Sequence, residues 1–330
     1  MGAPRISLRT AAVTGTATLL AGSGAGTASW AAYRLLMAQA GVARGVIGRD
    51  TSKPPEADGV YTAGCGAPEP WRTGKHADLH LMIFGDSTAA GVGCVTADGV
   101  PGVRIARALA DASGKRIRLS TKAISGATSK GLAGQVDAMF VAGPPPDAAV
   151  IFIGANDITK KHSISASARR LGAAVARLHL AGSVVVVGTC PDLGAVSAIP
   201  QPLRTIVRNW SVRLARAQFA VTTAAGGHPV VLGELGPEFR TAPEQMFSAD
   251  GFHPSAAGYE LAAARVLPAL LTALEQRGLR TDRDTRGPLR GLAARLRGLV
   301  AQKSGVIEAD DAEARNGRGG VPGARQVRYT

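Results

Sequence analysis

From about residue 80 onward, the chain alternates between short apolar runs and longer segments with helical periodicity. The apolar runs predict five strands, which read LHLMIFG, RIRLSTKAI, AAVIFIGA, SVVVVGTC and PVVLGEL. Helices are predicted between them at residues 102–113, 129–141, 164–181 and 203–224, and a last helix from Ser255 to about Arg277. This alternation is typical of a parallel sheet that is covered by helices.

Five such strands with helices on both faces make a flavodoxin-like three-layer α/β/α sandwich. In open sheets of this type, ligands bind at the carboxyl ends of the strands. Polar residues gather at those ends here: Gly85-Asp86-Ser87, Ser125-Gly126, Gly154-Ala155-Asn156-Asp157 and Asp250-Gly251-Phe252-His253. We therefore expect a site at this edge of the sheet.

The chain has 330 residues, which is enough for two average domains or for one domain with an extra segment at each end. The motifs favour one domain over residues 80–280. Residues 50–79 contain Pro54, Pro55, Pro68 and Pro70 with several glycines, as a linker would. Residues 281–330 form a basic tail rich in Arg and Gly, and its part from Glu308 onward has the composition of a disordered segment.

The first 49 residues resemble a targeting segment. Arg5 and Arg9 precede an uncharged stretch from Thr10 to Tyr33, which is long enough to span a bilayer as a helix. We expect an export signal or a membrane anchor, cleaved or retained, and hence a location in the cell envelope or outside the cell. The stretch is only weakly hydrophobic and Arg34 follows it, so a soluble Ala-rich helix is the alternative.

A second candidate for membrane contact lies in the tail. Leu289, Leu292, Leu296 and Leu299 repeat at helical spacing, and arginines fall around them. Such a basic amphipathic helix suits an anionic membrane surface, and it would equally suit packing against the domain.

The amino-acid composition limits the classes of function that this chain can have. Hydrophobic residues make up 45% of the chain and charged residues 19%, so a sizeable core is expected. The net charge of +14 suits an anionic partner, but aromatic residues are only 4% and no basic run alternates with them, which argues against nucleic acid. The histidines and cysteines show no metal-ligand spacing, so no metal or other cofactor is expected.

The three cysteines are Cys65, Cys94 and Cys190. In an exported chain Cys65 and Cys94 could form a disulfide that ties the leader segment to the loop after Ser87. Cys190 follows an apolar run and is expected in the core.

Ser87 is the candidate nucleophile. A serine hydroxyl needs a base within hydrogen-bond reach, and His253 can take its proton and return it to a leaving alcohol. Asp250, three residues earlier, can orient the imidazole. The oxyanion of the intermediate would be bound by the backbone N–H groups of Ser87 and Gly126 and by the side-chain amide of Asn156.

These blocks resemble the SGNH/GDSL hydrolase family over about residues 80–278. The family supplies Ser, Gly, Asn and His in the order of Ser87, Gly126, Asn156 and His253, and Thr88 replaces the Leu of its naming motif. Gly131 is the alternative for the second block, and Gly126 is chosen for its place at the strand end. The resemblance implies the flavodoxin-like sandwich, no metal, and hydrolysis of carboxylic esters or thioesters.

Other enzyme classes fit less well. Ala89 stands where the elbow of an α/β-hydrolase has its second glycine, and Thr96 stands where a dinucleotide fingerprint has its third. Asp157 is expected to be scaffold that holds the third loop, and the histidines other than His253 are expected in surface or core roles.

The substrate stays open among lipid esters, acetylated sugars, thioesters and small aryl esters. We expect short acyl chains, because no hydrophobic lid is evident between Ser87 and Gly126. A domain that has lost turnover and binds the cell envelope is the alternative of a different class, and the oligomeric state is not predicted.

Overall fold

The computed structural model describes residues 30–42, 45 and 53–278. A six-stranded sheet has the order β1-β3-β2-β4-β5-β6. Its strands are β1 (Gly59–Tyr61), β2 (Leu79–Gly85), β3 (Ile117–Thr121), β4 (Ala148–Phe152), β5 (Val184–Gly188) and β6 (His228–Val230). All neighbours pair in parallel except β1, which runs antiparallel to β3. The five parallel strands have the flavodoxin-like order, so the predicted fold class is confirmed.

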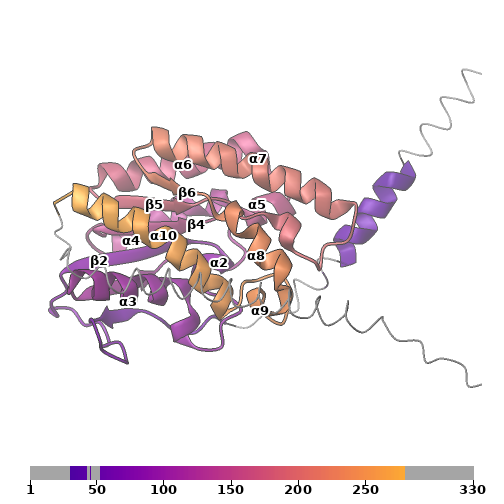
Figure 1. Cartoon of the computed structure of the whole chain (residues 1–330). Helices are drawn as coiled ribbons and strands as arrows, with labels where there is room; N and C mark the ends of the chain where they lie inside the picture. Colours follow the sequence, from indigo (N-terminus) through magenta and orange to yellow (C-terminus); the bar gives the residue numbers. More distant parts are fainter. Residues whose placement is uncertain (1–29, 43–44, 46–52, 279–330) are drawn as a thin grey trace, which may run out of the picture.

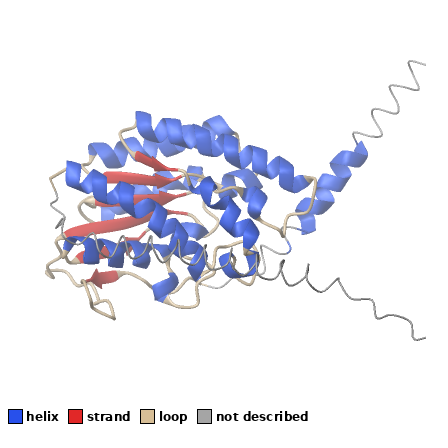
Figure 2. Cartoon of the chain, in the orientation of Figure 1, coloured by secondary structure: helices blue, strands red, loops and turns tan. Residues whose placement is uncertain are grey.

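Helices cover both faces of this sheet (Figures 1 and 2). One face packs against α3 (Pro101–Ser113) and α10 (Ala256–Gln276). The other face packs against α4 (Leu132–Ala142) and α6 (Ile164–Leu180), with α7 (Leu203–Ala224) lying against α6. Because strands β4 and β5 are buried on both faces, they read as continuous apolar runs in the sequence.

Short helices lie at the carboxyl edge of the strands (Figure 1). They are α2 (Ser87–Ala90), α5 (Ala155–Thr159), α8 (Gly236–Thr241) and α9 (Pro243–Met246). Four 3₁₀ turns lie between these strands and helices in the described part of the chain: η1 (Ala97–Gly99), η2 (Ser129–Gly131), η3 (Leu193–Ala195) and η4 (Leu232–Leu235). The loops that carry the conspicuous polar residues therefore meet at one edge of the sheet.

The interpretation of residues 50–79 as a linker is wrong in part. Strand β1 lies within that range, Val60 forms a bridge with Glu69, and Tyr61 is buried with its hydroxyl donating to the Ala57 carbonyl at 2.6 Å. The fold thus begins before residue 80. At the other end α10 stops at Gln276, and the predicted amphipathic helix at Leu289–Leu299 falls outside the described residues.

Two further expectations change. Cys65 is exposed, Cys94 is buried in the core, and both are free thiols, so the suggested disulfide is wrong. The Cys94 side chain is buried in the apolar cluster around α3 and α10, whereas Cys65 is exposed to solvent. Cys190 is buried, as predicted.

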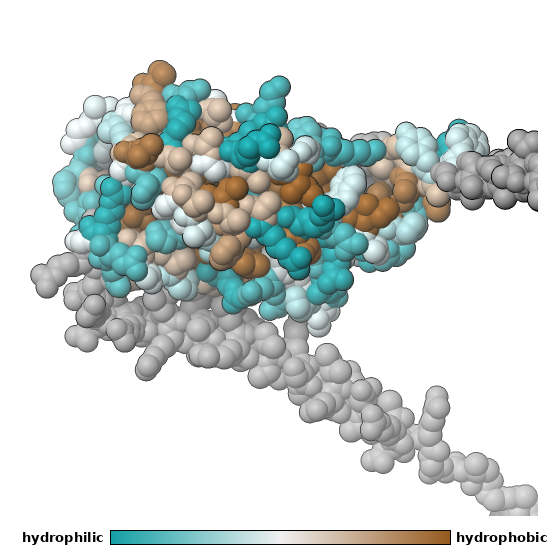
Figure 3. Space-filling view, turned by 90° about the horizontal axis from the view of Figure 1, so that it is seen from above, coloured by the Kyte–Doolittle hydropathy of each residue, from teal (hydrophilic) through white to brown (hydrophobic). Residues whose placement is uncertain are grey.

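Only the last part of the predicted N-terminal segment can be described. Residues 30–42 form a helix, and the Gln39 side chain contacts the Gln201 carbonyl and the Leu203 N–H at the start of α7. Among the described helices, α10 is the one long and apolar enough to cross a membrane. It packs against α3 and the sheet, so the core accounts for its apolar character. The face above α6 and α7 shows hydrophilic and hydrophobic side chains side by side (Figure 3).

Candidate active site

Ser87 lies in a sharp turn between β2 and α2. Gly85 ends the strand with φ at +135°, and a Cβ there would lie 1.8 Å from the Phe152 carbonyl oxygen. Asp86 is extended and caps the helix, because its carboxylate accepts a hydrogen bond from the Thr88 N–H at 2.9 Å. The turn holds Ser87, which is 6% exposed, at the first position of α2.

Asp250 and His253 lie on one turn of the loop before α10. One Asp250 oxygen accepts hydrogen bonds from the Ser248 hydroxyl and from the N–H groups of Phe252 and His253, at 2.8 to 2.9 Å. The other oxygen lies 2.5 Å from Nδ1 of His253. Burial raises the pKa of Asp250, but these hydrogen bonds outweigh burial and hold the pKa well below its ordinary value. Asp250 therefore stays ionised near neutral pH and can accept a hydrogen bond from Nδ1–H of the imidazole.

The two loops meet at the imidazole of His253. Its Nε2 lies 3.0 Å from the Ser87 hydroxyl oxygen, and its side chain is 8% exposed. With Nδ1–H donating to Asp250, Nε2 is left as the acceptor for the Ser87 proton. The structure thus brings Ser87, His253 and Asp250 together in an order that suits nucleophilic catalysis.

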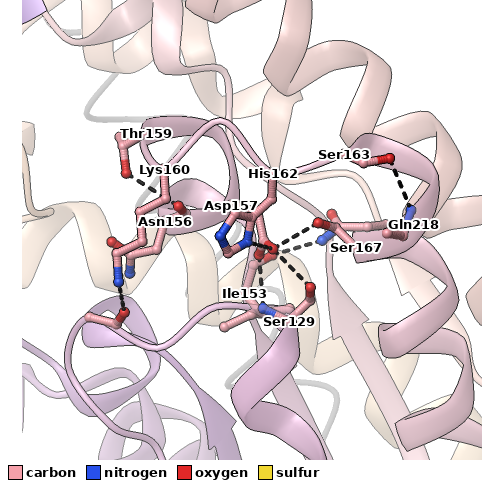
Figure 4. A network of polar contacts seen from close by, with 12 residues as sticks. Ser129, Ile153, Asn156, Asp157, Thr159, Lys160, His162, Ser163, Ser167 and Gln218 are labelled. Atoms are coloured by element: carbon pink, nitrogen blue, oxygen red, sulfur yellow. Dashed lines mark hydrogen bonds and ion pairs between the residues drawn. The ribbon is translucent and has the colours of Figure 1, made fainter.

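Gly126 and Asn156 lie on neighbouring loops at the same edge. Gly126 is in the loop after β3, two residues beyond Ile124, whose N–H donates to the Gly85 carbonyl at 3.1 Å. Its φ is +77° and it is exposed. Asn156 is in the first turn of α5, directly after β4, and is half-buried. Lys160 joins these loops, because its Nζ donates to the Gly126 carbonyl at 2.7 Å beside the Asn156 side chain (Figure 4).

Asp157 forms a second connection between the same two loops (Figure 4). Its buried carboxylate accepts hydrogen bonds from the Ser129 N–H at 2.9 Å and from the hydroxyls of Ser129 and Ser167 at 2.8 Å. His162 Nδ1 lies 3.3 Å from the same carboxylate. Asp157 therefore holds the third loop, as predicted, and fixes the second loop as well.

Two buried glutamines hold the strand ends and were missed in the sequence. Gln135 of α4 exchanges two hydrogen bonds of 2.8 Å with the backbone of Gly85. Gln218 of α7 donates to the Ile153 carbonyl at 2.9 Å and accepts from the Cys190 N–H at 2.6 Å. Both occupy inward positions of amphipathic helices, and a polar residue at such a position was the available signal.

An apolar cavity borders the imidazole. It has a volume of about 80 Å³ and is lined mostly by apolar side chains, among them Phe239, Phe247 and Leu232. Its polar lining residues are His253, Asp86, Thr88, Thr189 and Asp192. Burial raises the pKa of Asp86 to about 6, and hydrogen bonds from Thr88 and the charge of His253 oppose that rise. In the part of the chain that the structure describes, no group of three or more His, Cys, Asp or Glu side chains is arranged to hold a metal ion.

Comparisons with known proteins point to one family. A model of the GDSL-like lipase/acylhydrolase family matches residues 83–261. A GDSL-like esterase of Mycobacterium tuberculosis is 61% identical over 253 residues, which cover 76% of this chain and 81% of that protein.

Solved structures are less similar in sequence. The psychrotrophic esterase EstA of Pseudoalteromonas sp. is 19% identical with a TM-score of 0.47, over 62% of this chain and all of that one. A catalytic mutant of an acetylxylan esterase of Geobacillus stearothermophilus is 19% identical with a TM-score of 0.45, over 59% of this chain and 94% of that one.

Proposed function

This chain belongs to the GDSL-like lipase/acylhydrolase family and is a carboxylic ester hydrolase, and we propose that Ser87, His253 and Asp250 form its catalytic triad. The observation that carries the proposal is the unbroken path from the Asp250 carboxylate through the His253 ring to the Ser87 hydroxyl, with contacts of 2.5 and 3.0 Å. The proposed reaction has two steps.

In the first step, the Ser87 oxygen attacks the ester carbonyl while His253 takes the hydroxyl proton. Asp250 stabilises the imidazolium that forms, and the carbonyl oxygen becomes an oxyanion. The N–H groups of Ser87 and Gly126 and the Asn156 amide would bind this oxyanion. The intermediate collapses when the bond to the alcohol oxygen breaks, and His253 protonates that oxygen, which leaves an acyl group on Ser87.

In the second step, water attacks the acyl carbonyl and gives a proton to His253. The bond between the acyl carbon and the Ser87 oxygen then breaks, and Ser87 recovers its proton from His253. The products are a carboxylic acid and the regenerated enzyme. No metal or organic cofactor takes part in this proposed sequence.

The proposed substrates are esters of short acyl chains. The apolar cavity beside His253 has about 80 Å³, whereas an apolar cavity of about 150 Å³ holds one benzene ring. A series of p-nitrophenyl esters from two to twelve carbons should show kcat/KM highest at the short end. Activity that rises beyond about eight carbons would contradict this preference and favour a lipase.

The triad is tested by Ser87→Ala with p-nitrophenyl acetate and butyrate. The variant should lose nearly all turnover, and a hydrolysis rate equal to that of the wild type would exclude Ser87 as nucleophile. The matched control is Ser113→Ala at the last residue of α3, which lies just before the amino end of β3, at the edge of the sheet opposite the proposed triad, and should keep wild-type kinetics. Absence of turnover in the wild-type chain on every ester tested would favour a binding module instead.

We also propose that the domain acts outside the cytoplasm, with residues 1–49 as signal or anchor. The support is the uncharged stretch from Thr10 to Tyr33 after Arg5 and Arg9. Cell fractionation combined with intact-mass measurement of the mature chain tests this. A full-length chain found only in the cytosol would contradict it.

A further inference from the structure

A second cavity lies next to the apolar one and has a different chemical character. Its volume is about 510 Å³, which is within the range of small-molecule sites. One wall is a stripe of α7 that includes Arg208, Val212, Arg216 and Phe219, at spacings that share one helix face. The opposite wall is the segment from Val231 to Arg240, and Asp192 lies between them. We call this space the arginine cavity.

The lining of the arginine cavity carries more positive than negative charge. Arg208, Arg216 and Arg240 all line it, and against them stand Asp192 and Glu234. Glu234 already pairs with Arg265, which is not a lining residue. Asp192 is therefore the one lining carboxylate whose ion pairs are all with lining arginines, and its other oxygen accepts the Gly194 N–H at 2.9 Å. It faces three guanidinium groups.

Asp192 contacts two of these arginines and leaves most of their N–H donors without a partner from its carboxylate. A single oxygen of its carboxylate, Oδ2, lies 2.8 Å from Nη1 of Arg240 and 3.4 Å from Nε of Arg208. The side chain of Asp192 is 7% exposed, whereas those of Arg208 and Arg240 are 58% and 43% exposed, so a buried carboxylate lies between two solvent-exposed guanidinium groups. Each guanidinium has five N–H donors, and each gives one nitrogen to Asp192, so most donors remain available to a ligand.

Arg216 has no such restraint. Its side chain forms no hydrogen bond or ion pair with any residue in the described part of the chain, and it is exposed. Phe219, one helical turn further along α7, is 44% exposed, although a Phe side chain gains free energy by burial. The cavity thus combines unused cationic donors with an uncovered aromatic ring.

We propose that the arginine cavity binds an organic oxyanion, a carboxylate or a phosphate monoester, that carries a compact apolar group. The anion would bind to the guanidinium donors of Arg216 and Arg240, and the apolar group would cover Phe219 and Val212. Planar guanidinium groups match both carboxylate and phosphate oxygens, so the chemistry is shared by the two sources. The site does not depend on Ser87, and its occupancy can be measured whether or not the chain hydrolyses the esters proposed above.

The test is isothermal titration calorimetry of the full chain with three probes. Phenyl phosphate and benzoate are the two anion sources, and benzyl alcohol is the uncharged control. The proposal expects saturable binding of at least one anion, and whichever of them binds identifies the source. Benzyl alcohol should bind at least tenfold more weakly.

Variants on α7 separate this site from the general positive charge of the protein. Arg216→Gln should weaken anion binding roughly tenfold, as expected for one charge-assisted contact. Arg213→Gln removes the same charge from an exposed position of the same helix that does not line the cavity, and it should leave the affinity unchanged. Equal weakening by both variants, equal binding of benzyl alcohol, or no saturable binding of either anion would each overturn the proposal.

Discussion

Lys160 donates a hydrogen bond of 2.7 Å to the carbonyl of Gly126, and this contact joins the loop after β3 to the helix that follows β4. Gly126 and Asn156 are the two proposed oxyanion donors outside the nucleophile turn. Their relative position therefore depends on a bond between an exposed side chain and a backbone oxygen. In addition, the Lys160 N–H bonds to the Asn156 carbonyl at 3.0 Å, so one residue contacts both donors.

We predict that Lys160→Met lowers kcat about three- to tenfold with little change in stability. The contact is exposed, so its loss costs little folding free energy, but the Gly126 loop loses a restraint that matters in the transition state. Steady-state kinetics with p-nitrophenyl acetate measure the effect. Lys130→Met is the control, because it removes the same charge from an exposed position of η2. A comparable loss of kcat in both variants would show that charge, not the loop contact, matters.

The buried carboxylate of Asp157 leads to a prediction about stability. In Asp157→Asn an amide NH₂ replaces one of two oxygens that together accept from the Ser129 N–H and from the hydroxyls of Ser129 and Ser167. The amide oxygen can still accept from the Ser129 N–H, but the NH₂ then faces the two hydroxyls, which must reverse and accept, so both charge-assisted bonds from the hydroxyls are lost. We expect a loss of about 2 to 4 kcal/mol in the free energy of unfolding. Urea unfolding of the variant and the wild type measures it.

Asp137→Asn is the matched control for that measurement. Asp137 also accepts a short hydrogen bond, 2.7 Å from Arg177, but its side chain is 62% exposed and that of Arg177 is 43% exposed. A surface pair of this kind contributes at most about 1 kcal/mol. If Asp137→Asn cost as much as Asp157→Asn, burial of the carboxylate would not explain the effect.

The contacts of Lys160 and Asp157 could not be predicted from the sequence, whereas most strands and long helices could. Strands β4 and β5 and the long helices were predicted within a few residues, because buried strands and amphipathic helices leave periodic apolar patterns. Strand β1 was missed because three residues between prolines carry no such pattern. The run PVVLGEL was predicted as one strand, but β6 ends at Val230 and Leu232–Leu235 form a 3₁₀ turn. This edge strand pairs only with β5, so less of it is held in the sheet.

The polar contacts were predictable only where short spacing enforces them or where a residue directly follows a strand end. Asp250 and His253 are three residues apart, and Ser87 follows a strand end, so their meeting at one edge follows from the fold. By contrast, Ser129 and Asp157 are 28 residues apart on separate loops, and Gln135 reaches Gly85 across 50 residues. Such pairs depend on how the loops and helices pack against the sheet, and the periodic pattern of apolar residues carries no information about that packing.

Asp86 gives a prediction about pH. It is 2% exposed, and burial raises its pKa from the ordinary value near 3.8 to about 6. The folded protein therefore holds this proton more tightly than the unfolded chain. The resulting stabilisation is fully present below about pH 4 and is lost as the pH rises through 6. A shift of about two pKa units corresponds to about 3 kcal/mol.

Comparison of the wild type with Asp86→Asn isolates this contribution. The stability of the wild type relative to the variant should fall by about 3 kcal/mol between pH 4 and pH 7, as measured by urea unfolding at unit steps. Asp250, whose pKa is lowered, loses its stabilising effect only as the pH falls below its ordinary value, so it does not interfere in this window. A constant difference between the two proteins from pH 4 to 7 would show that Asp86 keeps its ordinary pKa.

Gly85 allows a test of the turn that presents Ser87. We predict that Gly85→Ala fails to give soluble native protein or loses more than about 4 kcal/mol of stability, because the new Cβ would lie 1.8 Å from the Phe152 carbonyl oxygen in strand β4. That oxygen also accepts the Asp86 N–H at 3.1 Å, so a movement of the oxygen away from the new Cβ would also break this hydrogen bond at the end of the β2–β4 pairing. Soluble yield and the thermal midpoint measure the effect.

Gly143→Ala separates this clash from the cost of the backbone conformation. Gly143 follows α4 with φ at +153°, a value that alanine likewise avoids, but a Cβ there would meet nothing within 4 Å. Its substitution should cost only about 1 to 3 kcal/mol, the usual penalty of such a conformation. If the two variants lost equal stability, the positive φ alone would account for both, and the close approach of β4 would not be the reason that glycine precedes the Asp86–Ser87 turn.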